Sequence, residues 1–189
     1  MIVEHRVFHF REYEIIEKLT IRAPFRYIRP FQESACFLYM RQGEAILYAS
    51  DKTLRFTNRE GVLLRCGTYF GDLIGKVNAE CCVVYAIHLF PELLREIYEN
   101  EIPPFIRSKS AAAISATRVP SSAIVDRFIE SLDFYFENPA IVSDDLLQLK
   151  LKELLLLLLQ MKPINASHAS CLNMRTPVNL GAFFLKLTS

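Results

Sequence analysis

Hydrophobic positions change their spacing about halfway along the chain. Over residues 3–89, runs rich in Tyr, Phe and Val alternate with polar positions and are separated by Gly-marked turns, as half-buried strands are. Over residues 121–160 the apolar residues recur at helical spacing instead. The pattern predicts four parts: a β-barrel with a short helix over 1–106, a linker over 107–120, a helical hairpin over 121–160 and an irregular tail over 161–189.

Seven or eight short strands are expected in the first part. Residues 35–40 and 45–49 flank a connection that contains Gly43, which suits a hairpin because glycine reaches positive φ at low cost. Residues 79–89 are almost wholly apolar, so this strand is expected to be buried on both faces. Short strands separated by regular turn signals indicate a sandwich or a barrel.

The second part should contain two helices. Ser121 or Ser122 caps the first, Asn138-Pro139 ends it, and Ser143 caps the second. Residues 154–159 are six leucines, so this end of the second helix has almost no polar face. The barrel, the neighbouring helix or another subunit must cover it. We expect a contact stripe for a homodimer made of Leu151, Leu154, Leu155 and Leu158.

Charge and composition narrow the function. The chain has 22 basic and 21 acidic residues, which gives no bulk support for direct binding to nucleic acid. No signal-peptide core is visible, and the leucine run is far shorter than the ~20 residues that cross a bilayer. Five cysteines without C-x-x-C spacing indicate reduced, mostly buried thiols. These features predict a soluble, cytoplasmic protein without a membrane partner.

Sites for metals and for catalysis are not expected. His5 and His9 lie four apart on a predicted strand, roughly 13 Å from each other and too far to share an ion. His88 ends the long apolar strand and His168 lies in the tail, so no cluster has ligand spacing. The known nucleophile, zinc-protease and nucleotide-loop motifs are absent. We therefore predict no catalytic residue, no metal and no cofactor.

Four tyrosines are candidates for a ligand pocket. Aromatic side chains with a polar tip suit a small-molecule site. They could equally be core, because side chains normally fill the interior of a small barrel. The tentative pocket residues are Tyr39, Tyr48, Tyr69 and Tyr85.

Two segments resemble a known family. Residues 36–44 (CFLYMRQGE) and 61–67 (GVLLRCG) resemble the double-stranded β-helix of cupins, and residues 149–155 (LKLKELL) resemble the helix after that barrel in AraC-type transcriptional regulators. The resemblance implies a mainly β, cupin-like jelly-roll barrel followed by a two-helix dimerisation segment. At the positions where cupins place a metal-binding Glu and His, this chain has Cys36 and Phe70, so the resemblance implies a shell without metal chemistry.

In that family the barrel senses an effector or a partner protein, the helices often dimerise, and a separate pair of helix-turn-helix motifs binds DNA. The resemblance implies a non-enzymatic sensor domain whose partners are a second copy and a small-molecule or protein effector. DNA would be reached only through a helix-turn-helix domain that we expect this chain to lack, either as an isolated domain or as a truncated or frame-altered product. Two alternatives stay open: a free-standing cupin enzyme with an atypical site, and a protein-interaction module with a filled barrel.

Overall fold

A computed structural model describes residues 1–31, 34–74, 81–99 and 115–160. Residues 107–114 of the predicted linker, the predicted tail at 161–189 and His168 lie outside the described residues. Among the residues that are described, no helix is both long and apolar enough to span a bilayer.

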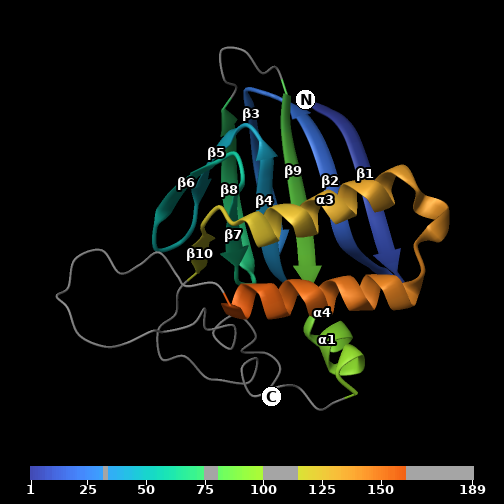
Figure 1. The fold of residues 1–189 in the computed structure, drawn as a ribbon. Helices are drawn as coiled ribbons and strands as arrows, with labels where there is room; N and C mark the ends of the chain where they lie inside the picture. The colour runs from blue at the N-terminus through green and yellow to red at the C-terminus, as the bar shows by residue number, and fades with distance from the viewer. Residues whose placement is uncertain (32–33, 75–80, 100–114, 161–189) are drawn as a thin grey trace.

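Two antiparallel sheets face each other (Figure 1). The larger has the order β1-β2-β9-β4-β7-β10 and consists of β1 (Ile2–Phe10), β2 (Tyr13–Arg22), β9 (Cys81–Leu89), β4 (Ala35–Gln42), β7 (Glu60–Leu64) and β10 (Ala116–Val119). The smaller has the order β3-β8-β5-β6 and consists of β3 (Phe25–Phe31), β8 (Gly67–Ile74), β5 (Glu44–Tyr48) and β6 (Thr53–Thr57). The chain therefore forms the predicted mainly β fold as a two-sheet sandwich.

Local sequence explains the turns and the late strand. Gly43 lies between β4 and β5 with φ +113°, and its N–H donates to Asn58 Oδ1 over 2.6 Å. The turn is present, but the predicted hairpin is wrong: β4 pairs with β7 and β9 in the larger sheet, whereas β5 pairs with β6 and β8 in the smaller one. Within the predicted linker, residues 116–119 form β10, which pairs with β7. The last part of the predicted linker is thus an edge strand of the larger sheet.

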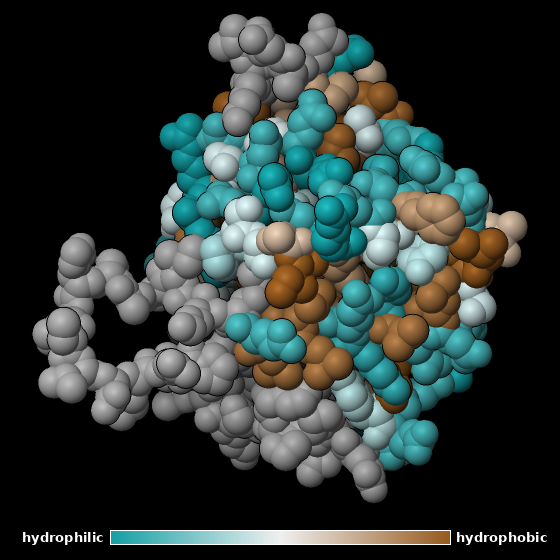
Figure 2. Space-filling view, viewed as in Figure 1, coloured by the Kyte–Doolittle hydropathy of each residue, from teal (hydrophilic) through white to brown (hydrophobic). Residues whose placement is uncertain are grey.

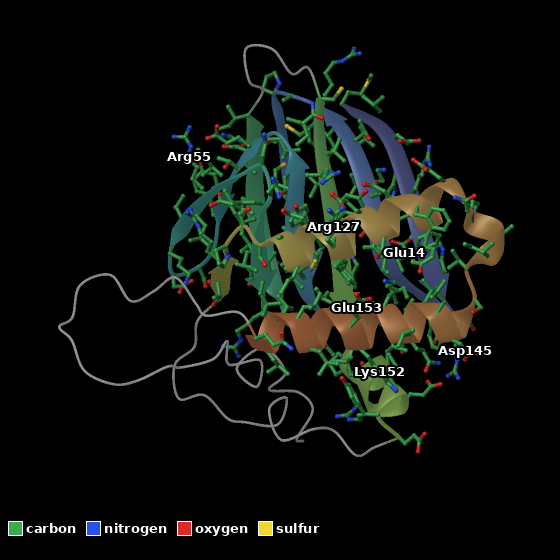
Figure 3. The ribbon with its side chains drawn as sticks, viewed as in Figure 1. Glu14, Arg55, Arg127, Asp145, Lys152 and Glu153 are labelled. Atoms are coloured by element: carbon green, nitrogen blue, oxygen red, sulfur yellow. The ribbon has the colours of Figure 1, made fainter. Side chains whose placement is uncertain are left out.

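Helices cover the outer face of the larger sheet. They are α1 (Pro91–Ile97), α3 (Ala123–Glu137), the 3₁₀ turn η1 (Pro139–Ile141) and α4 (Asp144–Gln160). Figure 1 shows α3 and α4 lying across the strands on one side of the sheet. Ser122 caps α3 by accepting from the N–H of Ile124, as predicted. Lys152 points from α4 toward α1 (Figure 3), and its ammonium lies 5.6 Å from the centre of the Tyr98 ring.

The core has two layers because the central strands are covered on both faces. Between the sheets, alternate residues such as Leu38, Val84 and Leu73 form one buried cluster. The opposite faces of the same strands pack against the helices in a second cluster. Six consecutive residues of β4 are buried for this reason, and β9 is buried at nearly every position, which confirms the two-sided burial predicted for it.

The four leucines expected at a dimer interface lie in this second layer instead. Leu151 is 1% exposed, and Leu154, Leu155 and Leu158 are fully buried within the chain. They pack with α3 and the outer face of the larger sheet. The expectation placed them wrongly because a leucine run does not show which of its faces the chain itself covers. The exposed leucines of α4 are Leu149 and Leu156.

Candidate functional site

A largely apolar cavity of about 200 Å³ lies between the two sheets. Strands β2, β4 and β9 of the larger sheet form one wall, and β3 and β8 of the smaller sheet form the other. For comparison, an apolar cavity of ~150 Å³ in another protein holds benzene. The lining residues are Ile2, Leu19, Ile21, Phe25, Tyr27, Ile28, Arg29, Phe31, Leu38, Leu73, Val84 and Ala86.

The alternation of β3 builds the second wall. Phe25, Tyr27, Arg29 and Phe31 are more buried than the residues between them, so they turn toward the larger sheet. Tyr27 pairs in register with Gly71, and a Cβ at Gly71 would lie 2.2 Å from Tyr27 Cζ. Glycine at this position therefore leaves room for the ring. Burial raises the pKa of Tyr27 to about 12, so its hydroxyl is neutral.

Arg29 is the one charged side chain among the described residues that line this cavity. It also lines a second, more polar cavity of about 280 Å³, together with Glu14, Ser34, His88 and other residues. Arg29 and Phe31 are common to both linings, so they separate the apolar space from the polar one. A guanidinium at such a border can bind a carboxylate whose apolar body occupies the first cavity.

The guanidinium is held by a buried carboxylate. Glu17 on β2 is fully buried and pairs with Arg29 of the opposite sheet. Its Oε1 also lies 2.6 Å from His88 Nε2, and its Oε2 lies 2.7 Å from His5 Nε2. An ionised carboxylate only accepts hydrogen bonds, so both Nε2 atoms carry the proton. Burial alone would raise the pKa of Glu17, but the hydrogen bond from His88, the charge of Arg29, the electrostatic effect of His88 and the hydrogen bond from His5 hold it below its ordinary value.

The structure does not bring the four candidate tyrosines to one cavity. Tyr39 and Tyr85 face the helices, where their hydroxyls donate to Asp126 and Asp133. Tyr69 lies between the sheets, and its hydroxyl is 2.7 Å from the carbonyl oxygen of Ser115 and 3.0 Å from that of Arg65, either of which can accept its one proton. Tyr48 is 39% exposed and lies on the outer surface.

Strand parity explains this outcome. Residues 39 and 85 are odd-numbered neighbours of Leu38, Val84 and Ala86, and it is these neighbours that face the cavity. Burial alone does not say which face of a two-sided strand points inward. Tyr27 and Arg29 line the cavity but were not among the predicted pocket residues. The alternation of residues 25–31 was the available signal.

The histidines take different partners from those considered for a metal. His5 binds Glu17, whereas His9 Nε2 lies 3.8 Å from Glu14. In the described parts of the chain, no three His, Cys, Asp or Glu side chains are arranged to hold a metal ion. The meeting of His5 with His88 at one carboxylate was not predicted, because it depends on the pairing of β1, β2 and β9.

Comparison with known proteins gives a family and a fold. A family model described as the ExsA N-terminal regulatory domain matches residues 35–166. No curated protein sequence matches the chain at a significant level.

Three solved structures align with this chain, two of them with a TM-score above 0.5. ToxT from Vibrio cholerae strain SCE256, bound to an unsaturated fatty acid, aligns with a TM-score of 0.54 and 12% identity over 74% of this chain and 52% of that one. ToxT from Vibrio cholerae O395, bound to (E)-4-(8-methylnaphthalen-1-yl)but-3-enoic acid, aligns with a TM-score of 0.52 and 12% identity. This alignment covers 75% of this chain and 55% of that one. The AraC-like activator CuxR aligns with a TM-score of 0.45 and 12% identity over 72% of this chain and 48% of that one. The chain thus spans about half the length of ToxT.

Proposed function

The chain belongs to the family of ExsA N-terminal regulatory domains of AraC-type regulators, and we propose that its sandwich senses a small carboxylic acid with an apolar body. Arg29 at the border of the apolar cavity is the observation that carries this proposal. The acyl or aryl part would fill the space between the sheets, and the carboxylate would bind the guanidinium. Both ligands named for the two ToxT structures are carboxylic acids with apolar bodies, which supports the same class here.

The strands that line the cavity also hold the helices. Leu38, Val84 and Ala86 face the ligand space, while Tyr39 and Tyr85 between them bind α3 on the other face. A ligand that moves β4 or β9 therefore also moves Tyr39 or Tyr85, which bind α3. If the bound and free forms hold α3 differently, the ligand shifts the population between them by its difference in affinity.

Calorimetric titration with octanoate tests the site. We expect octanoate to bind, and octanamide, which has the same tail but no charge, to bind much more weakly. Arg29→Gln should weaken octanoate binding about tenfold or more, because a charge-assisted contact is lost. Arg26→Gln is the matched control, since Arg26 lies on the same strand but points outward to Asp72. Equal binding by the Arg29 and Arg26 variants would reject the role of Arg29.

We also propose that the domain pairs with a second copy through the outer face of α4. Leu149 and Leu156 lie seven residues apart, hence on one side of the helix, and are 59% and 51% exposed. Figure 2 shows hydrophobic side chains gathered along this helix. A symmetric dimer uses the same patch twice, so a single helix face suffices.

Light scattering tests this pairing. Leu149→Glu with Leu156→Glu should convert a dimer into a monomer without lowering the urea midpoint. Ile124→Glu, an equally exposed change on α3, is the control. A dimer that survives the double substitution would reject this surface, and a monomeric parent protein would reject the pairing.

The two alternatives receive less support. The cavity between the sheets favours a sensor over an interaction module with a filled interior. We propose no catalytic role, in keeping with the regulatory family. DNA contact is assigned to helix-turn-helix segments rather than to this sandwich, because charge in the chain is balanced. Stoichiometric iron, zinc or manganese in the purified protein would favour the enzyme instead.

A further inference from the structure

We infer that Arg29, Glu17, His5 and His88 form a proton-linked latch, so that the domain takes up a proton when Arg29 turns from Glu17 to an acidic ligand. The inference rests on the proposed function, because it concerns how that site exchanges Arg29 between two carboxylates. It adds a dependence on pH that the cavity alone does not imply.

The latch joins the two sheets at the border of the cavity. Glu17 is on β2, its neighbours His5 and His88 are on β1 and β9 of the same sheet, and Arg29 is on β3 of the opposite sheet. Arg29 is one-third exposed and Glu17 is fully buried. The Arg29 guanidinium can therefore turn toward a ligand, whereas the buried Glu17 carboxylate is confined to its present position.

In the described part of the chain, other titratable groups lie near this cluster, among them Tyr27, whose hydroxyl is neutral. Glu14, on the same strand as Glu17, lines the polar cavity with Arg29 and His88. Cys36 on β4 is buried, which raises the pKa of its thiol and keeps it neutral. Ser34 Oγ lies 3.4 Å from His88 Nδ1 and can accept or donate there. The groups that bond directly to Glu17 and can take a proton are the two imidazoles of His5 and His88.

Charge balance gives the direction of the effect. In the ligand-free domain the charges of Glu17 and Arg29 cancel. When a ligand carboxylate binds Arg29, the buried site holds two negative groups and one positive one. One proton from solvent, bound by His5 or His88, restores neutrality beside Glu17 by forming an imidazolium. No bond other than that N–H forms, and the ligand remains an anion.

Calorimetry in buffers with different ionisation enthalpies counts the protons bound with octanoate. Near neutral pH we expect the uptake of nearly one proton for each octanoate bound. Over the pH range in which that proton is taken up, the affinity for octanoate should rise by up to about tenfold for each unit by which the pH falls. His88→Gln and His5→Gln should reduce the uptake, whereas His9→Gln, on the same strand as His5 but outside the latch, should not.

A ligand-free measurement decides the latch if octanoate does not bind. In Arg29→Gln, the imidazole protons of His5 and His88 followed by NMR should titrate at higher pH than in the parent protein, because Glu17 has lost its cation. Octanoate binding with no proton uptake overturns the latch and leaves the effector site intact. Unchanged histidine titration in Arg29→Gln overturns the latch whether or not octanoate binds, and failure of octanoate to bind overturns only the effector site.

Discussion

Tyr39 and Tyr85 are direct partners across β4 and β9, and each donates its hydroxyl to a different aspartate of α3. The two acceptors, Asp126 and Asp133, lie seven residues apart, which places them two turns apart on one side of the helix. Arg59 also binds Asp126, and Lys18 also binds Asp133. Directional polar contacts therefore fix the position of α3 along the sheet, in addition to apolar packing.

Removing one of these hydroxyls should destabilise the domain. In Tyr39→Phe the ring stays, but Asp126, which is 3% exposed, keeps Arg59 alone as a side-chain hydrogen-bond partner among the described residues. We expect a loss of about 1.5–3 kcal/mol in the free energy of unfolding, the usual range for a hydrogen bond to a charged group. Urea denaturation measures it.

Tyr48→Phe is the matched control, because its half-exposed hydroxyl binds Asp72 over 3.2 Å at the surface. Its loss should stay within about 0.5 kcal/mol. Equal losses in the two variants would contradict the helix-seating role of Tyr39. Tyr39→Phe and Tyr85→Phe together should not be additive, since both act on one helix.

The leucines of α4 should divide into two classes. Leu154→Ala removes a fully buried side chain between the helices and the sheet, so we expect a loss of about 2–5 kcal/mol in the free energy of unfolding. Leu156→Ala changes an exposed side chain and should cost less than about 0.5 kcal/mol. Thermal or urea unfolding measures both, and similar losses would contradict the assignment of Leu154 to the core of a single chain.

Patterns that depend on neighbours in the chain were readable from the sequence. The turn at Gly43, the Ser122 cap, the two-sided burial of β9 and the order of sheet before helices follow from turn chemistry and periodicity. These features are local, so one sequence suffices to predict them.

The sequence did not reveal which face of a strand packs against the helices and which faces the other sheet. Tyr39 and Leu38 are equally apolar in pattern, yet one binds a helix and the other lines the cavity. The joining of Glu17 to Arg29 needs two sheets to meet, and no spacing along the chain encodes that contact. The candidate site was therefore missed while the fold class was predicted.

Gly71 should control the size of the cavity. Alanine there would place a Cβ 2.2 Å from the Tyr27 ring, which must then move. Because Tyr27 lines the cavity, we expect Gly71→Ala to weaken octanoate binding more than it lowers stability. Calorimetry and urea denaturation measure the two effects. Gly67→Ala is the control, since a Cβ there would meet its nearest neighbour at 3.5 Å, and equal effects would argue against this role of Gly71.

Glu17 should make the stability of the domain depend on acid. Its pKa in the folded state lies below its ordinary value, because the bonds from His88, Arg29 and His5 outweigh burial. A group of this kind stabilises the fold above its unfolded pKa, near 4.3, and that stability is lost as the pH falls through the lower folded value.

Glu17→Gln tests this dependence by urea denaturation at several pH values. At neutral pH the variant should be less stable by roughly 3 kcal/mol, since a buried ion pair loses one partner. Below about pH 4.3 the difference should shrink, because the parent carboxylate becomes protonated as well. Glu14→Gln, three residues earlier on the same strand and half exposed, should show no such convergence. A gap between Glu17→Gln and the parent protein that stays constant into acid would mean that Glu17 is not held as an anion.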